Sequence, residues 1–160
     1  MEPKGQFTTE RVFDAPLATV WKAWTDPTLL KQWWGPHNVS IPECEVDLQV
    51  GGKFHIVMEA GEAMGPYAGT LWPMLATFTE VEPEAKLAFE AEAWTEGQKE
   101  TTTIEQTTEV TFSEQDGKTV VKINAVIHNA GSDAGMAVQG MEAGFNQQLD
   151  KFTAFLAEQK

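Results

Sequence analysis

Three histidines are the first side chains to consider for chemistry, because imidazole is both a common metal ligand and a proton-transfer group near neutral pH. His37 follows a short apolar helix pattern, whereas His55 and His128 fall in separate strand patterns. A catalytic zinc site usually takes three protein ligands, and no helical His-Glu-x-x-His spacing brings two of these histidines together. His55 alternates with apolar neighbours and should point away from the interior. The spacing predicts no metal site and leaves His37 as the candidate acid or base.

Cys44 is the only cysteine, so no intrachain disulfide can form and a reducing, cytoplasmic setting is expected. It occupies an inward position of an alternating strand pattern, where a thiol acts as a small apolar side chain. The spacing places no activating base beside it. The chain also lacks a Gly-x-Ser-x-Gly elbow, a phosphate loop and a dinucleotide fingerprint. We therefore predict no catalytic residue and no cofactor.

The charge balance limits the possible partners. The chain has 11 basic and 24 acidic residues, a net charge of -13 and a pI near 4.5. Phosphate recognition needs a basic surface, so this balance argues against nucleic acid and against an anionic membrane surface. No apolar run approaches the roughly 20 residues of a membrane span, and residues 1–5 do not resemble a signal peptide. We expect neither a nucleic-acid nor a membrane partner.

Large apolar rings are the unusual part of the composition, with six Trp and nine Phe against a single Tyr. Such rings bury extensive apolar surface. Trp21, Trp24 and Phe152 recur at helical spacing and are predicted to lie in an ordinary core. The other rings must be placed by the elements that carry them.

Hydrophobic periodicity predicts the order of these elements. A strand over residues 7–13 precedes two short capped helices, over 17–24 and 27–34. Alternation and turn residues then predict a series of strands, over 44–50, 54–58, 77–81, 86–94, 101–112 and 120–128. Gly51-Gly52 is typical of a tight hairpin, and Pro73 predicts that any strand through it is an edge strand or carries a bulge. A long amphipathic helix follows Ser132 and Asp133.

Consecutive strands joined by hairpins form an antiparallel sheet with one solvated face, here supplied by the alternating acidic residues Glu43, Glu45, Asp47, Glu90 and Glu92. The long helix must cover the other face. Gly135, Gly140 and Gly144 cost that helix about 1 kcal/mol each relative to alanine, so they indicate either close backbone packing or the border of a pocket. The sequence predicts one α+β domain over residues 1–160, in which a curved sheet of six to seven strands wraps around the C-terminal helix.

A series of motifs resembles a known family over residues 7–157. The motifs are Arg-Val-Phe-Asp-Ala-Pro at 11–16, Val-Trp-Lys-Ala-Trp-Thr-Asp-Pro at 20–27, Trp-Trp-Gly-Pro at 33–36, the run 46–54, Glu-Val-Glu-Pro at 80–83, Lys-Leu-Ala-Phe at 86–89, and Gly140-Met141 with Phe145. The family is named after the activator of the heat-shock-protein-90 ATPase and belongs to the START-like or SRPBCC superfamily. The resemblance implies a helix-grip fold with a deep, mainly apolar cavity between the sheet and the last helix.

The chain departs from the family pattern at three places. Gln49-Val50 stands where the family usually has Arg-Pro, the segment 71–76 is longer than usual, and Phe145 replaces a frequent Trp. Each departure affects which ligand the cavity would accept.

Candidate cavity residues follow from inward alternation in such a fold, with Tyr67 and Asn146 as the polar groups that orient a ligand and Met58, Met64 and Met74 near the mouth. The predicted ligand-binding set is Trp33, Trp34, His37, Phe54, Ile56, Met58, Tyr67, Met74, Phe89, Trp94, Phe145, Asn146 and Leu149.

Three functions are compatible with this pattern. The leading hypothesis is binding of a small apolar or amphipathic molecule. The first alternative is an enzyme of cyclase, hydrolase or dehydratase type, which would require a buried ionisable group facing the cavity, either His37 or Tyr67. The second is a chaperone-associated regulatory module, implied by the family name. A homodimer is also expected, through the edge strand near Pro73 and an exposed Trp72.

Overall fold

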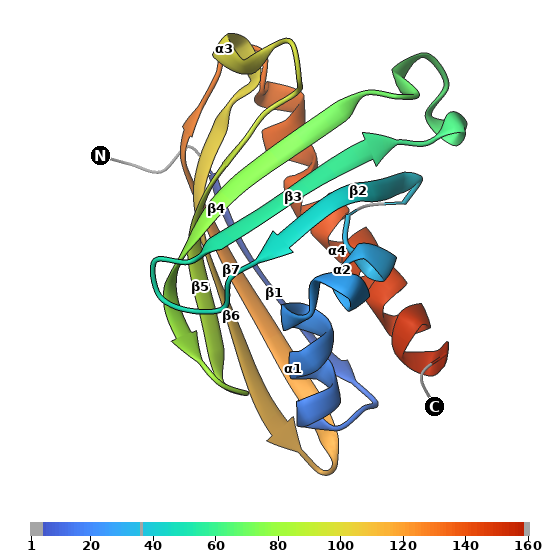
Figure 1. The fold of residues 1–160 in the computed structure, drawn as a ribbon, viewed down its shortest axis with the longest axis vertical. Coiled ribbons are helices and arrows are strands. Elements are labelled where there is room, and N and C mark those ends of the chain that lie inside the picture. Colours follow the sequence, from blue (N-terminus) through green and yellow to red (C-terminus); the bar gives the residue numbers. More distant parts are fainter. Residues whose placement is uncertain (1–4, 36, 159–160) are drawn as a thin grey trace.

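The computed structural model describes residues 5–35 and 37–158 (Figure 1). The chain begins with β1 (Gly5–Phe13), α1 (Leu17–Thr25) and α2 (Pro27–Trp33) and ends in the long helix α4 (Gly135–Glu158). The intervening strands are β2 (Val39–Val46), β3 (Lys53–Ala60), β4 (Leu71–Glu82), β5 (Lys86–Ala93), β6 (Ile104–Gln115) and β7 (Lys118–Ala130). Two short helices connect strands: η1 (Glu62–Tyr67) between β3 and β4, and α3 (Lys99–Thr102) between β5 and β6.

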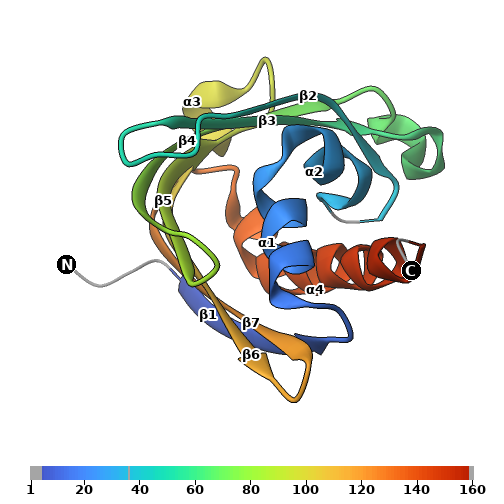
Figure 2. The same ribbon diagram turned by 60° about the horizontal axis from the view of Figure 1, so that its bottom comes forward.

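The strands form one seven-stranded antiparallel sheet in the order β1-β7-β6-β5-β4-β3-β2. Figure 2 shows that this sheet curves around α4, while α1 and α2 lie against the same concave side. The predicted helix-grip architecture is confirmed. None of the helices in the described ranges is long and apolar enough to cross a membrane.

Both predicted short helices are present, but only α2 has the predicted cap from the side chain of its N-cap residue. Asp26 caps α2 by accepting a hydrogen bond from the Thr28 backbone N–H at 2.9 Å, and Pro27 occupies the first turn, where its missing N–H costs nothing. The backbone N–H of Trp34 still donates to Leu30, and the next residue, Gly35, has a φ of 87°. The helix ends because Trp34 is extended, with φ -66° and ψ 149°, and the left-handed Gly35 then turns the chain away from the helix axis.

Pro73 lies in an interior strand, so the edge position, one of the two predicted alternatives, is wrong. The other alternative, a bulge, is found in the same strand but further along, as a register shift against β5 between Phe78 and Glu80. Pro73 pairs with Val57 of β3, and its carbonyl accepts from the Trp94 N–H at 3.1 Å, just beyond the end of β5. The backbone N and C=O of a strand residue point to the same side, so the N–H that Pro73 lacks would also have faced β5, just beyond its last residue. Its absence therefore removes little from the hydrogen bonding between β4 and β5. The outer strands are β1 and β2, and Trp72 is half-buried. The homodimer remains a prediction, but an edge strand at Pro73 no longer supports it.

The strand predicted over 44–50 is displaced toward the N-terminus, since β2 begins at Val39 and ends at Val46. Leu48 and Val50 lie in the loop before β3 and are exposed. Gly52 is required there, because a Cβ on it would meet the Asp47 carbonyl oxygen at 2.0 Å. The turn is therefore a wider loop closed on its own backbone, with Asp47 N–H donating to the Lys53 carbonyl at 2.7 Å.

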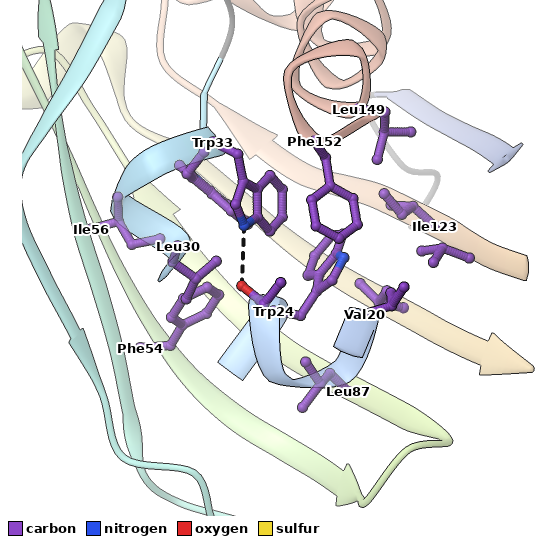
Figure 3. Close-up of a cluster of buried hydrophobic side chains, with 14 of the residues drawn as sticks. Val20, Trp24, Leu30, Trp33, Phe54, Ile56, Leu87, Ile123, Leu149 and Phe152 are labelled. Atoms are coloured by element: carbon purple, nitrogen blue, oxygen red, sulfur yellow. Dashed lines mark hydrogen bonds between the residues drawn. The ribbon is translucent and has the colours of Figure 1, made fainter. Parts of the chain in front are cut away.

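Buried apolar side chains from α1, α2, α4 and the sheet meet in a core that contains several aromatic rings, as Figure 3 shows. The ring of Trp33 lies 4.4 Å from Phe152 of α4 and 4.9 Å from Trp24 of α1, measured between centroids. Its indole N–H donates to the Ala23 carbonyl at 3.1 Å, so the polar atom of this buried ring is satisfied. The predicted core roles of Trp24 and Phe152 are confirmed, while Trp21 is half-buried against this cluster.

Candidate ligand-binding cavity

Beside this core lies a cavity of about 330 Å³. It lies between the sheet and the first half of α4, at the end of the sheet where α3 and η1 are found (Figure 1). Its apolar wall consists of Trp34, Val39, Ile56, Met58, Met64, Trp72, Met74, Ala93, Trp94, Ile104, Met141 and Phe145, with Gly140 and Gly144.

Each strand that borders the cavity changes role along its length. In β3, Phe54 lies in the core only, Ile56 belongs to the core and also lines the cavity, and Met58 on the same face lines the cavity. Helix α4 is divided in the same way: Gly140, Met141, Gly144, Phe145 and Gln148 border the cavity, and Leu149 and Phe152 are fully buried in the core. The inner face of the sheet is therefore continuous, but only one end of it is filled by α1 and α2.

The helix glycines border open space. A Cβ built on Gly140 or Gly144 would meet no atom within 4 Å, so close backbone packing does not explain either residue. Both line the cavity, which is the second explanation that the sequence left open. Gly135 also faces open space but does not line the cavity. Two glycines one helical turn apart thus enlarge the cavity at a cost in helix stability.

The polar lining is small and uncharged. It comprises Thr95, Thr102, Gln106 and Gln148, and the described wall contains no Asp, Glu, His, Lys, Arg, Cys or Tyr. The backbone N–H of Thr95 donates to the Thr102 hydroxyl at 2.9 Å, so these two polar groups are partners of each other. The two glutamines differ: Gln106 Oε1 and Gln148 Nε2 are buried and have no hydrogen-bond partner.

Three residues of α4 hold the segment that carries Trp34. Gln148 Oε1 accepts from the Gly35 N–H at 3.0 Å, and Gln147 Oε1 accepts from the His37 N–H at 3.1 Å. Lys151 Nζ donates to the Trp34 carbonyl at 3.0 Å, and burial lowers the pKa of this ammonium. These contacts fix the Trp34 ring at the boundary between core and cavity.

Six of the predicted residues lie in the cavity wall: Trp34, Ile56, Met58, Met74, Trp94 and Phe145. Four others point inward but lie at the filled end of the sheet, where they form core: Trp33, Phe54, Phe89 and Leu149. The inward direction was predicted for all ten, but direction alone does not give position along the strand.

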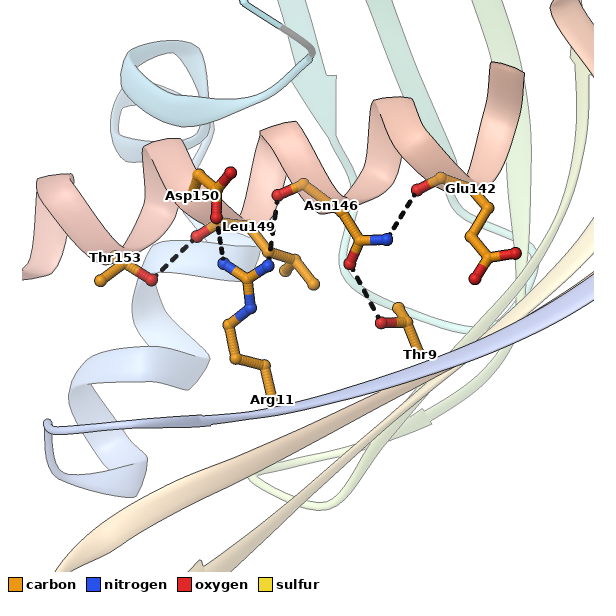
Figure 4. Close-up of polar contacts among 7 residues, drawn as sticks. All are labelled: Thr9, Arg11, Glu142, Asn146, Leu149, Asp150 and Thr153. Carbon is orange, nitrogen blue, oxygen red and sulfur yellow. Dashed lines mark hydrogen bonds and ion pairs between the residues drawn. The ribbon is translucent and has the colours of Figure 1, made fainter. Parts of the chain in front are cut away.

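The three predicted polar residues lie outside the cavity. Tyr67 is 63% exposed at the end of η1, and His37 is exposed. Asn146 faces β1, as Figure 4 shows: its Oδ1 accepts from the Thr9 hydroxyl at 3.2 Å, and its Nδ2 donates to the Glu142 carbonyl at 3.1 Å. With the ion pair between Arg11 and Asp150 at 2.7 Å, this contact attaches α4 to the first strand.

The polar residues that do line the cavity had detectable sequence signals. Gln106 lies between Ile104 and Thr108 on the inward face of β6, where a long amide side chain is unusual. Gln148 lies four residues after Gly144 and four before Phe152, within the apolar stripe of α4. A polar residue inside an apolar pattern was therefore the informative feature.

The remaining histidines lie on the outer face of the sheet or at its surface. His55 Nδ1 is 4.0 Å from a Glu45 carboxylate oxygen, and His128 Nε2 is 2.7 Å from the Thr107 hydroxyl. Among the described residues, no group of three His, Cys, Asp or Glu side chains is placed to hold a metal ion.

Cys44 is expected to react slowly with alkylating reagents. Burial raises the pKa of its thiol to about 11, and the Lys31 cation offsets this only in part. At pH 7.5 the thiolate fraction should be about two orders of magnitude below that of an unperturbed cysteine. The rate with iodoacetamide should rise about tenfold per pH unit up to pH 10 without a plateau; a plateau near pH 8.5 would contradict the buried placement.

The same shift has a consequence for stability. The pKa of the Cys44 thiol is higher in the folded than in the unfolded chain, so above about pH 8.5 the thiol ionises more readily in the unfolded chain. The free energy of unfolding should therefore be unaffected by this group below about pH 8.5 and should fall as the pH rises toward 11. Denaturation midpoints between pH 8 and 11 should therefore fall more in the native sequence than in Cys44→Ala.

The fold and the cavity together define a class: a helix-grip protein with an apolar internal cavity under its last helix. The chain belongs to the Activator of Hsp90 ATPase homolog 1-like protein family, whose sequence model matches residues 14–157, and with it to the START-like or SRPBCC type. The resemblance stated from the motifs is thus confirmed. No curated protein sequence matches this chain.

Solved structures with the same fold come from several bacteria. A protein from Nitrosomonas europaea is 23% identical, with a TM-score of 0.75 over 96% of this chain and 95% of that one. One from Mycobacterium smegmatis is 24% identical, with a TM-score of 0.75 over 97% and 92%. One from Arthrobacter aurescens is 26% identical, with a TM-score of 0.74 over 96% and 86%.

Proposed function

We propose that this chain binds a small apolar or amphipathic molecule in the cavity between the sheet and α4. The observation that carries the proposal is the cavity itself, about 330 Å³ with a mainly apolar wall. This volume lies within the range of small-molecule sites in proteins. At interior packing density it accommodates roughly 16 non-hydrogen atoms. Family membership supports the proposal, since such proteins commonly bind hydrophobic ligands.

The wall composition sets the expected affinity. A ligand of this size buried against apolar side chains gains roughly 25 cal/mol per Å² of its apolar surface. Part of that gain is offset by lost translational and rotational freedom. A dissociation constant of about 1–100 µM is expected for a molecule that makes apolar contacts only.

A neutral fluorescent probe tests the proposal directly. Trp34, Trp72 and Trp94 line the cavity, so N-phenyl-1-naphthylamine bound there should quench tryptophan emission and gain emission of its own. We expect saturable 1:1 binding that 2-isopropylnaphthalene, a non-fluorescent competitor at the probe's wavelengths, displaces. Emission that rises linearly with probe concentration and resists displacement would overturn the proposal.

The alternatives have less support. The enzyme hypothesis requires a proton-transfer group facing the cavity, and the two candidates, His37 and Tyr67, are exposed. The chaperone-associated hypothesis depends on the family description alone. Binding of an apolar molecule is the function that the described geometry favours.

A further inference from the structure

Two buried glutamine atoms in the cavity wall lack hydrogen-bond partners. Gln106 is 7% exposed and Gln148 is 4% exposed, yet Gln106 Oε1 and Gln148 Nε2 contact no donor or acceptor. A buried polar atom without a partner costs about as much as its lost hydration, and folded proteins contain few such atoms. Both side chains line the same cavity. A ligand is therefore the natural partner for each atom.

The amide of Gln148 is oriented by the protein. Its Oε1 accepts from the Gly35 backbone N–H at 3.0 Å, and a flipped amide would set its NH₂ group against that N–H. The free atom is consequently the Nε2 donor. It can satisfy a ligand oxygen without any rearrangement of α4 or of the segment that carries Trp34.

The surroundings of Gln106 supply no internal partner. Its neighbours across the sheet are Ala91 of β5 and Ile127 of β7, neither of which has a polar side chain. Ile104, two residues away on the same face, is apolar as well. The free Oε1 is an acceptor and requires a hydrogen-bond donor from the ligand.

Charge in the wall distinguishes neutral from ionised ligands. The described lining residues carry no cation that could pair with a carboxylate or a phosphate. The nearby Lys151 ammonium donates to the Trp34 carbonyl and does not line the cavity. An anion in this apolar space would keep a desolvation cost that a single neutral amide donor, Gln148 Nε2, offsets only in part.

We infer that the ligand is an uncharged amphipathic molecule with a carboxamide or hydroxyl head, which donates a hydrogen bond to Gln106 Oε1 and accepts one from Gln148 Nε2. Its apolar body occupies the space under Gly140 and Gly144. The inference rests on the proposed function and adds the polarity and charge of the ligand to it.

Three probes with one ring system and similar size separate the possibilities: naphthalene-2-carboxamide, 2-isopropylnaphthalene and 2-naphthoate. Binding is measured by displacement of N-phenyl-1-naphthylamine at pH 7.4. We expect the amide to bind at least about tenfold more tightly than the hydrocarbon, and the anion to bind most weakly. Equal affinity of the amide and the hydrocarbon would overturn the inference but leave the proposed function intact. Absence of binding by all three would count against the proposed function itself.

A substitution at Gln106 tests whether this residue causes the preference for the amide probe. Gln106→Leu replaces the unpaired acceptor by an apolar side chain, so it should raise the melting temperature of the ligand-free protein and abolish the preference for the amide while the hydrocarbon still binds. Thr108→Val is the matched control: Thr108 lies two residues along the same face, its hydroxyl is also buried without a partner, and it does not line the cavity. It should raise the melting temperature and keep the amide preference. An undiminished amide preference in Gln106→Leu would overturn the inference.

Discussion

Gly144→Leu should make the protein more stable and at the same time weaken ligand binding by about two orders of magnitude. Replacing a helix-interior glycine gains about 1 kcal/mol of helix propensity. The new side chain enters space where a Cβ meets nothing within 4 Å, against the apolar wall, which adds burial. A total stabilisation of about 1–2 kcal/mol is expected, measured as an increased midpoint of urea denaturation without ligand.

The same side chain takes room from the ligand. Four added carbon atoms exclude about as many ligand atoms, which removes roughly 2–3 kcal/mol of binding free energy. The affinity for N-phenyl-1-naphthylamine should therefore fall about 30- to 160-fold. Opposite effects on stability and on binding are the expected mark of a glycine kept for function rather than for packing.

Two variants separate cavity filling from helix propensity. Gly144→Ala gains the propensity but adds a single carbon atom, so it should be more stable and bind the probe within a few-fold of the native sequence. Ala143→Leu adds bulk on the exposed side of the same helix turn and should leave binding unchanged. If Gly144→Leu binds the probe as well as Gly144→Ala does, the ligand does not lie between α4 and the sheet.

The sequence predicts which way these side chains face far better than where along the sheet they lie. Alternation places Phe54, Ile56 and Phe89 correctly on the inner face. What fills the space opposite each one depends on α1 and α2, which are distant in sequence and cover only one end of the sheet (Figure 2). Local periodicity carries no information about that coverage, so core and cavity residues were predicted as one set.

The polar residues show a different limit. Asn146 was chosen because it is polar and lies on the last helix, but it borders the apolar stripe and bonds to Thr9 of β1. Gln148, within the stripe, reaches the cavity. Helical periodicity could have separated the two, because residues 144, 148 and 152 share a face and residue 146 does not. That Gln148 also holds Gly35 depends on a contact between residues 113 positions apart, which a single sequence does not show.

Two phenylalanines of α4, two helical turns apart, test the division of the interior into a filled core and a cavity. Phe152→Ala should cost about 3–5 kcal/mol, because its fully buried ring packs against Phe13, Trp24 and Trp33 and its loss leaves a void that those rings cannot fill.

Phe145→Ala should cost only about 1–2 kcal/mol, because this half-buried ring already borders the cavity and its one close ring partner is Phe7, at 5.3 Å. Its removal enlarges a space that exists rather than opening a new one, so bulkier probes should bind more tightly than they do to the native chain. Urea denaturation of the two ligand-free variants gives the comparison, with Phe152→Leu as the milder change should Phe152→Ala be too unstable to purify. If the two substitutions lower the free energy of unfolding equally, the interior is filled equally around both rings. Such a result would contradict the cavity on which the proposed function depends.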